Sequence, residues 1–214
     1  MFSWEPLESM HFTIHPQNPE PRAIRKAAEL LAAGGVVIYP TDTIYGLGCS
    51  VESRDAIERI YLIKGQRSDR PFSFVCSDLT HISSYAHVSN AAFKIMKRLI
   101  PGPYTFILPA ARMKQLPRIL VSKRKTVGIR VPASPATLAL VKELGHPILS
   151  TSVTDGEGSI LNDPERILET YGNIVDAILD AGLLTSAPST VLDLTGDEVK
   201  IVRQGAGDTS FLEH

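Results

Sequence analysis

The stretch VVIYPTDTIYGLG, residues 36–48, joins an apolar run to a dense group of polar side chains. The run at residues 36–39 ends at Pro40, which is typical of a short buried strand. From Tyr39 onward the stretch contains four hydroxyl side chains, one carboxylate and two glycines. Because α/β sheets bind ligands where strands end, we expect a ligand site here, with Gly46 and Gly48 allowing close backbone approach. A plain turn is the alternative, since Thr, Asp and Gly are also common in turns.

The sequence on both sides of this stretch predicts an α/β fold with α+β-like mixing of its elements. Apolar residues at helical spacing predict helices at residues 22–33, 53–63, 90–99, 134–144 and 163–171. Short apolar runs predict strands at residues 36–39, 72–76, 104–108, 126–131, 147–152, 175–179, 190–194 and 199–202. Their irregular alternation indicates one mixed sheet with helices packed against it.

Length and composition indicate a single domain over residues 1–214, with residues 1–20 as a peripheral segment. The chain is 43% hydrophobic and 21% charged, which is ordinary for a globular protein. No apolar run approaches the ~20 residues of a membrane span, and residues 1–15 lack the apolar core of a signal peptide. We therefore expect a cytoplasmic protein with no membrane partner. Cys49 and Cys76 fit no zinc or redox spacing and are expected to be reduced and buried.

Charge is distributed very unevenly along the chain. Residues 79–142 contain eleven Lys and Arg and no acid, whereas the rest carries eleven basic and all twenty-three acidic residues. The segment is thus at +11 and the remainder at −12, although the whole chain is at −1. This asymmetry indicates a surface that binds an anionic ligand. The alternative is a set of solvated faces whose charges are paired with acids elsewhere in the fold.

Named catalytic and nucleotide-binding motifs are absent from the sequence. It contains no G-x-x-x-x-G-K-[ST], no G-x-G-x-x-G, no H-E-x-x-H and no nucleophile elbow. We therefore expect neither a metal site nor a covalent nucleophile. His11 and His15 lie four residues apart, but in a polar segment where a surface pair is the simpler explanation.

Further polar segments follow other predicted elements. KGQRSDRP, residues 64–71, is a basic loop after a helix, although Lys64 alone is also explained by the helix dipole. If Val127, Ile129 and Val131 face the core, Arg130 projects from the opposite face and suits a carboxylate or phosphate; a solvated arginine is the alternative. STSVT (150–154), PST (188–190) and RQGAG (203–207) add hydroxyls, an arginine and glycines. The set suits a site for an amino acid and a phosphate-bearing ligand.

These segments, in this order, resemble the YrdC-like family of threonylcarbamoyl-adenylate synthases. The resemblance runs from about residue 21 to residue 208. It is carried by PTDTIYGLG (40–48), PGPYT (101–105), VGIRVP (127–132), PSTV (188–191) and RQG (203–205). STSV (150–153), with KRKTVG (123–128), looks most like the YciO branch of the family.

The resemblance implies an open, twisted mixed sheet with a positively charged concave face. It implies a nucleotidyltransferase that joins bicarbonate to L-threonine as a carbamate and then adenylates the carbamate with ATP and its Mg²⁺, releasing pyrophosphate. The product is used to make threonylcarbamoyladenosine in tRNA. Members of the family also bind double-stranded RNA, for which Lys123, Arg124 and Lys125 are the candidate residues here.

The resemblance also implies the roles of individual residues. Thr41, Thr43 and Tyr45 would line the threonine pocket, and Arg130 would hold the threonine carboxylate. The residues expected to bind the nucleotide are Lys64, Ser152, Thr154, Ser189 and Arg203, and those expected to be catalytic are Lys64, Arg67 and Ser152. Two positions depart from the family pattern. Gln66 stands where a K-x-R element has Arg, with Arg67 one place later, and Thr154 replaces the Asn of an S-x-N element.

These departures leave three hypotheses. The first is an active synthase of threonylcarbamoyl-adenylate. The second is a YciO-type paralogue that binds nucleotide and tRNA or double-stranded RNA, with weak or no synthase activity, because losing one charge-stabilising donor can lower a rate by ~10²–10³. The third is a different acyl- or carbamoyl-phosphate enzyme that uses the same anion site.

Overall fold

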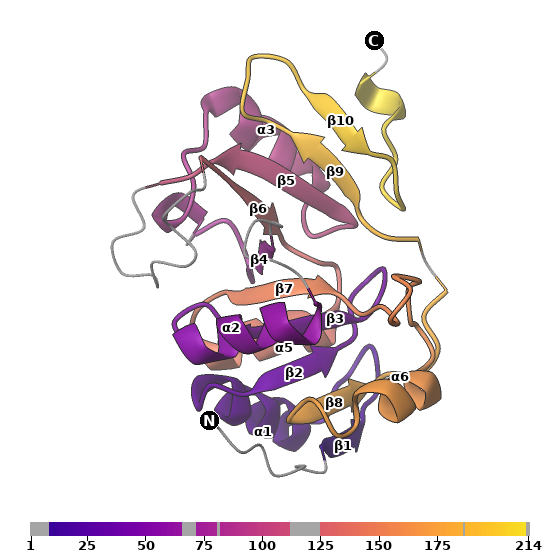
Figure 1. The fold of residues 1–214 in the computed structure, drawn as a ribbon. Coiled ribbons are helices and arrows are strands. Elements are labelled where there is room, and N and C mark those ends of the chain that lie inside the picture. Colours follow the sequence, from indigo (N-terminus) through magenta and orange to yellow (C-terminus); the bar gives the residue numbers. More distant parts are fainter. Residues whose placement is uncertain (1–8, 66–71, 81, 112–124, 186, 213–214) are drawn as a thin grey trace.

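A ten-stranded mixed sheet runs through the molecule in the order β1-β8-β2-β3-β7-β4-β6-β5-β9-β10 (Figure 1). The computed structural model describes residues 9–65, 72–80, 82–111, 125–185 and 187–212. The strands are β1 (Met10–Thr13), β2 (Val36–Tyr39), β3 (Gly46–Ser50), β4 (Ser73–Val75), β5 (Tyr104–Pro109), β6 (Thr126–Arg130), β7 (Ile148–Ser152), β8 (Ala177–Asp180), β9 (Thr190–Asp193) and β10 (Lys200–Arg203). The helices are α1 (Pro21–Ala32), α2 (Arg54–Ile63), α3 (Asn90–Leu99), α5 (Pro135–Leu144) and α6 (Pro164–Tyr171). The short 3-10 turns are η1 (Ile82–Ser84) and η2 (Ser210–Leu212).

The mixed α/β fold predicted from the sequence is confirmed, but two strands were not predicted. β1 lies in the segment expected to be peripheral and forms the edge of the sheet by pairing in parallel with β8. β3 was interpreted as a ligand-approach loop or a turn, and it is a fully buried strand between β2 and β7. Its two glycines and one serine give it little of the β-branched character by which strands are recognised.

Tyr39 explains why β3 is rich in glycine. The Tyr39 ring lies against the glycines of β3, so that a Cβ at Gly46 would be 2.9 Å from Tyr39 Cζ, and one at Gly48 2.9 Å from Cε1. The Gly48 position is closed further by Ile148, whose Cγ2 would be 2.5 Å from such a Cβ. The glycines therefore make room for a neighbouring aromatic ring. The prediction that Gly48 lets a ligand approach the backbone is wrong, whereas Gly46 also borders the cavity described below.

Alternating residues of the strands face two hydrophobic cores. One core contains Val37, Tyr39 and Ile148 together with residues of α1 and α5. The other contains Leu47, Leu149 and Ile129 together with residues of α2, α3 and α6. A cavity lies on the α1/α5 face of the sheet. It is bordered by residues of β4, β5, β6, β9 and β10. The candidate site lies on this half of the sheet.

The N-terminus of α5 fixes the loop that follows β2. Ser134 caps the helix by accepting a hydrogen bond from the Thr137 amide, as is common for serine at this position. The hydroxyls of Ser134 and Thr137 both donate to the carbonyl oxygen of Pro40, at 3.1 and 2.6 Å. The polar loop thus starts from a fixed point.

Among the residues described, no helix has the length and apolar character that crossing a membrane requires.

We predict that Gly48→Ala destabilises the protein by about 1–3 kcal/mol, because the new methyl group would overlap Ile148 and Tyr39. Urea unfolding followed by circular dichroism measures the change. Gly156→Ala is the matched control, since its Cβ would meet nothing within 4 Å. Equal midpoints for the two variants would contradict the packing explanation.

Candidate functional site

A cavity of about 350 Å³ lies on the open half of the sheet. Its walls come from the loop after β2 and from strands β3 to β7, β9 and β10. The described residues that line it include two arginines, Arg130 and Arg203, several Ser and Thr hydroxyls, and no Asp or Glu. Its size falls within the range of small-molecule sites. The cavity therefore favours a ligand with negative charge.

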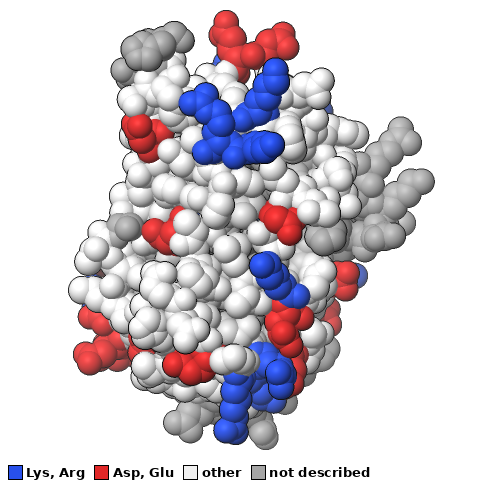
Figure 2. Space-filling model, turned by 180° about the vertical axis from the view of Figure 1, so that it is seen from behind, with Lys and Arg blue, Asp and Glu red and all other residues white. Residues whose placement is uncertain are grey.

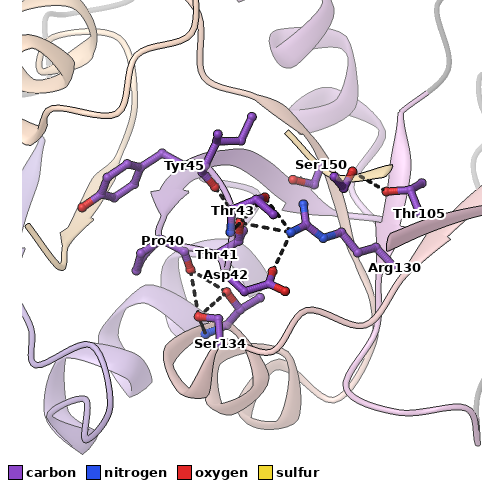
Figure 3. Close-up of polar contacts among 12 residues, drawn as sticks. Pro40, Thr41, Asp42, Thr43, Tyr45, Thr105, Arg130, Ser134 and Ser150 are labelled. Atoms are coloured by element: carbon purple, nitrogen blue, oxygen red, sulfur yellow. Dashed lines mark hydrogen bonds and ion pairs between the residues drawn. The ribbon is translucent and has the colours of Figure 1, made fainter. Parts of the chain in front are cut away.

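Arg130 projects into this cavity as its strand pattern predicts. Val127, Ile129 and Val131 are buried in the core on the other face. The Arg130 Nη2 donates to Asp42 Oδ1 at 2.5 Å and to Thr43 Oγ1 at 2.7 Å, and lies 3.3 Å from Thr41 Oγ1 (Figure 3). Arg130 Nε and Asp42 Oδ2 are buried and have no hydrogen-bond partner among the described residues. The guanidinium is thus only partly satisfied by the protein.

The loop residues predicted to bind threonine play unequal parts in the geometry. Thr41 borders the cavity and donates its hydroxyl to the carbonyl of Ile44 at 2.6 Å. Thr43 is buried beside it and touches Arg130. Tyr45 borders the cavity, but its hydroxyl donates to the Gly182 carbonyl at 2.8 Å and accepts from the Ala181 amide at 3.0 Å. The Tyr45 hydroxyl is therefore hydrogen-bonded to the two residues that follow β8, and its ring points away from Arg130 (Figure 3).

Lys64 and Thr154 lie together beside Ser152, and neither is among the residues that line the cavity. The Lys64 Nζ donates to the Ser152 carbonyl at 3.3 Å and to the Thr154 hydroxyl. Burial lowers the pKa of Lys64 below its ordinary value, and the charge of Asp155 partly opposes this effect. Ser152 borders the cavity, so β7 connects the lysine to it. Arg67 lies outside the described residues.

Ser189 and Arg203 form the opposite wall. The Arg203 Nε and Nη2 donate to the Ser189 carbonyl at 3.2 and 2.9 Å. The Ser189 hydroxyl is 2.9 Å from that of Thr105. Burial and, to a smaller extent, the positive charge of Arg130 lower the pKa of Arg203. The two guanidinium groups border the same cavity and repel each other. An anion bound between them would reduce this repulsion.

The acid-free segment contributes less to the cavity than its charge suggested. Lys94, Lys97 and Arg98 are exposed on α3, whose Ala92 and Met96 pack against the other face of the sheet. Figure 2 shows a cluster of basic side chains near the top of this view. Of the basic residues of the segment that are described, Arg130 is the one that borders the cavity. The interpretation of this segment as the basic wall of a concavity is therefore wrong for α3.

The remaining sequence predictions have separate outcomes. Cys49 and Cys76 are free and buried, as expected, and burial raises the pKa of both thiols. Lys125 is exposed at the start of β6, while Lys123 and Arg124 lie outside the described residues. In the part of the chain that is described, no three His, Cys, Asp or Glu residues are grouped to hold a metal ion.

Sequence reasoning missed two groups that shape the site, Asp42 and Thr105. Asp42 was counted as one carboxylate of a polar loop, but it is the ion-pair partner of Arg130. A buried arginine in a strand requires an acceptor, and this requirement was the available signal. Thr105 alternates with core residues of β5 and could have been assigned to the same face as Arg130.

Comparison with known proteins places this chain in one family. The Sua5/YciO/YrdC family, described as "Telomere recombination", matches residues 29–205. The chain is 45% identical to the uncharacterized protein YciO of Escherichia coli over 202 residues, which cover 94% of this chain and 97% of that protein. It is 33% identical to the threonylcarbamoyl-AMP synthase of Bacillus subtilis over 184 residues, covering 85% of this chain and 53% of that protein.

Solved structures agree with the sequence comparison. The crystal structure of E. coli YciO matches with a TM-score of 0.87 at 44% identity, covering 94% of this chain and 98% of the other. The structure of P. abyssi Sua5 complexed with L-threonine matches with a TM-score of 0.85 at 28% identity, covering 92% of this chain and 58% of the other. The protein belongs to the Sua5/YciO/YrdC family, as the resemblance of its motifs predicted.

We predict that Asp42→Asn destabilises the fold by about 3–5 kcal/mol, because a buried guanidinium would lose its charged partner. Guanidinium chloride unfolding measures the loss. Glu58→Gln removes the exposed pair with Arg54 and should leave the midpoint unchanged. Similar midpoints for both variants would mean that the Arg130 pair contributes nothing specific.

The lowered pKa of Lys64 gives a second prediction. In ¹⁵N-lysine NMR, its Nζ should titrate at a lower pH than an ordinary lysine, and bound ATP should move this titration upward, because phosphate favours the charged ammonium. ATP affinity should accordingly fall as the pH rises through this lowered pKa. Lys94, on the far face, is the internal control and its signal should not respond to ATP. An unresponsive Lys64 would separate it from the phosphate site.

Proposed function

We propose that the protein forms L-threonylcarbamoyl-adenylate from L-threonine, bicarbonate and ATP, for threonylcarbamoyladenosine modification of tRNA. The observation that supports this most is the cavity lined by two arginines and no described acid. A zwitterionic amino acid and a nucleotide both bring negative oxygen atoms that guanidinium groups bind well. The threonine-bound P. abyssi Sua5 and the B. subtilis synthase support threonine and ATP as the substrates.

On the threonine side, the proposal assigns the amino acid to the wall made by the loop after β2. Arg130 would bind the carboxylate with donors that Asp42 and Thr43 do not use, while Thr41 and the backbone of Tyr45 would enclose the rest. Asp42 keeps the guanidinium in place before the substrate arrives. Preorganisation of this kind reduces the entropy that binding must overcome.

On the nucleotide side, Lys64, Ser152, Ser189 and Arg203 would hold the phosphates and the nucleoside of ATP, which carries its own Mg²⁺. The threonine amine adds to bicarbonate with loss of water, and a carbamate oxygen then attacks the α-phosphate while pyrophosphate leaves. The protein would accelerate this step by positioning the two anions and balancing their charge. Arg67 is the further residue assigned to this step.

A YciO-type paralogue that binds nucleotide and RNA, with weak or no synthase activity, is the second candidate. Two features favour it. The Lys64 ammonium already has two hydrogen-bond acceptors, and one of them is Thr154, which stands where the family element has Asn. Thr154 can supply a hydroxyl but lacks the separate amide donor and acceptor groups of Asn. Exposed lysines and arginine on α3 would provide the charge for contact with an RNA backbone.

Pyrophosphate release separates the two candidates. With ATP, bicarbonate and L-threonine, the synthase should release pyrophosphate in proportion to threonine, and Arg203→Ala should lower kcat/KM by roughly 10²–10³-fold. Lys94→Ala, on the far face, is the matched control and should keep full activity.

A different result would favour the paralogue. No threonine-dependent release, together with ATP binding that ignores threonine in calorimetry, would eliminate the synthase. The paralogue then requires tRNA or duplex-RNA binding whose affinity falls steeply with salt concentration. Loss of that binding in a Lys94→Ala/Lys97→Ala variant would place the RNA contact on α3.

A further inference from the structure

Ser150 lies in the floor of the cavity and has no role in the function proposed above. It precedes Ser152 by two residues on β7, so both side chains lie on the cavity face of the sheet. It is paired in register with Gly48 on one side and Ser73 on the other, and Ser73 is in turn opposite Gly128. Only 9% of Ser150 is exposed. Its hydroxyl therefore lies on the cavity face of the sheet, on the strand next to the open half.

The partner of Ser150 is Tyr39, which reaches it across an intervening strand. Tyr39 lies on β2 and is completely buried, and its hydroxyl donates to Ser150 Oγ at 2.6 Å. β3 lies between these two strands, and the contact passes over Gly46. A Cβ at Gly46 would be 3.1 Å from both the Tyr39 hydroxyl and Ser150 Oγ. The glycine thus leaves the space in which this hydrogen bond forms.

The hydrogen bond has a direction that matters for the cavity. A phenol is more acidic than an aliphatic alcohol and is the better donor of the two. Burial raises the pKa of Tyr39, so the phenol keeps its proton. Among the described residues the Tyr39 hydroxyl has no other partner, and none accepts a hydrogen bond from Ser150. Ser150 Oγ therefore accepts from Tyr39, and its own proton remains available to the cavity.

We propose that Ser150 is an additional ligand-binding residue whose hydroxyl donates to an anionic oxygen of the bound ligand, and that Tyr39 is its positioning residue. Accepting a hydrogen bond from Tyr39 polarises the Ser150 hydroxyl and strengthens it as a donor. Arg130 and Arg203, on the walls of the same cavity, supply the charge that draws the anion there. The oxygen belongs either to the carboxylate of the amino acid or to a phosphate of the nucleotide. The inference rests on the proposed function only in its choice of ligands for the test.

The test is a calorimetric titration of the full chain with three ligands: L-threonine, ATP and inorganic pyrophosphate. Ser150→Ala should weaken binding of at least one of them by roughly 10- to 100-fold, which is the range for a hydrogen bond to a charged group. An effect on threonine alone assigns the carboxylate, and an effect on ATP and pyrophosphate assigns a phosphate. Ser159→Ala, on an exposed loop outside the cavity, is the matched control and should bind as wild type does.

The role of Tyr39 requires a double-mutant cycle. Tyr39→Phe should weaken binding of the same ligand in the wild-type background and have no further effect in the Ser150→Ala background, because it acts through Ser150. A purely structural role would instead lower the thermal midpoint and leave every Kd unchanged. Ser150→Thr keeps a hydroxyl and should retain most of the affinity, whereas Ser150→Cys, a weak donor of similar shape, should bind like Ser150→Ala. These two variants replace Ser150→Ala if that variant does not fold.

Each outcome decides the inference separately from the proposed function. If Ser150→Ala binds all three ligands as tightly as wild type, the inference is overturned and the proposed function is untouched. If wild type binds pyrophosphate without any coupling between threonine and ATP, and Ser150→Ala weakens that binding, the synthase fails and Ser150 stands. If wild type binds none of the three, both are overturned. Additive effects of the Tyr39 and Ser150 changes would remove Tyr39 from the proposal.

Discussion

Arg130 carries a positive charge with 8% of its residue surface exposed, and the surrounding structure is arranged to make that burial tolerable. A buried guanidinium without acceptors would cost several kcal/mol. Asp42 and Thr43 supply acceptors from the loop after β2, although β2 and β6 are separated in the sheet by β3, β7 and β4. The loop can reach Arg130 because α5 holds its first carbonyl at Pro40. One ion pair therefore determines where the polar loop and the cavity wall lie.

The extent to which the sequence predicted this arrangement depended on whether a signal was local. Val127, Ile129 and Val131 alternate on β6, so the face of Arg130 followed from strand geometry alone. The packing role of Gly46 and Gly48 did not follow from the local sequence, because the Tyr39 ring that lies against them belongs to another strand. β3 was not predicted because the contacts that determine its structure also come from other strands. Its residues have weak strand propensity, and its pairing with β2 and β7 decides its structure.

The acid-free segment illustrates a different limit of sequence reasoning. The basic residues of a segment form one charged surface only if they all lie on the same face of the folded protein. Residues 79–142 instead pass from α3, on one face of the sheet, through β6, whose Arg130 points to the other face. Lys94, Lys97 and Arg98 thus cannot act on the same ligand as Arg130. The positive character of the cavity comes from Arg130 and Arg203, which are 73 positions apart in the sequence.

Two arginines face the cavity, and this bears directly on what it can bind. The positive charge of Arg130 contributes to the lowered pKa of Arg203, while Asp42 neutralises only the Arg130 side of the cavity. A neutral ligand would leave this repulsion in place, whereas an anion between the two arginines would relieve it and gain charge-assisted hydrogen bonds. Lys64 is a third cation beside Ser152, and its hydrogen bonds to Ser152 and Thr154 leave one of its three N–H donors for a phosphate. Binding of an anion in this cavity would thus depend mainly on the two arginines. Under the proposed function, the rate of adenylation would depend on how closely Lys64 approaches the phosphate, and an active synthase and a binding paralogue would differ at this point.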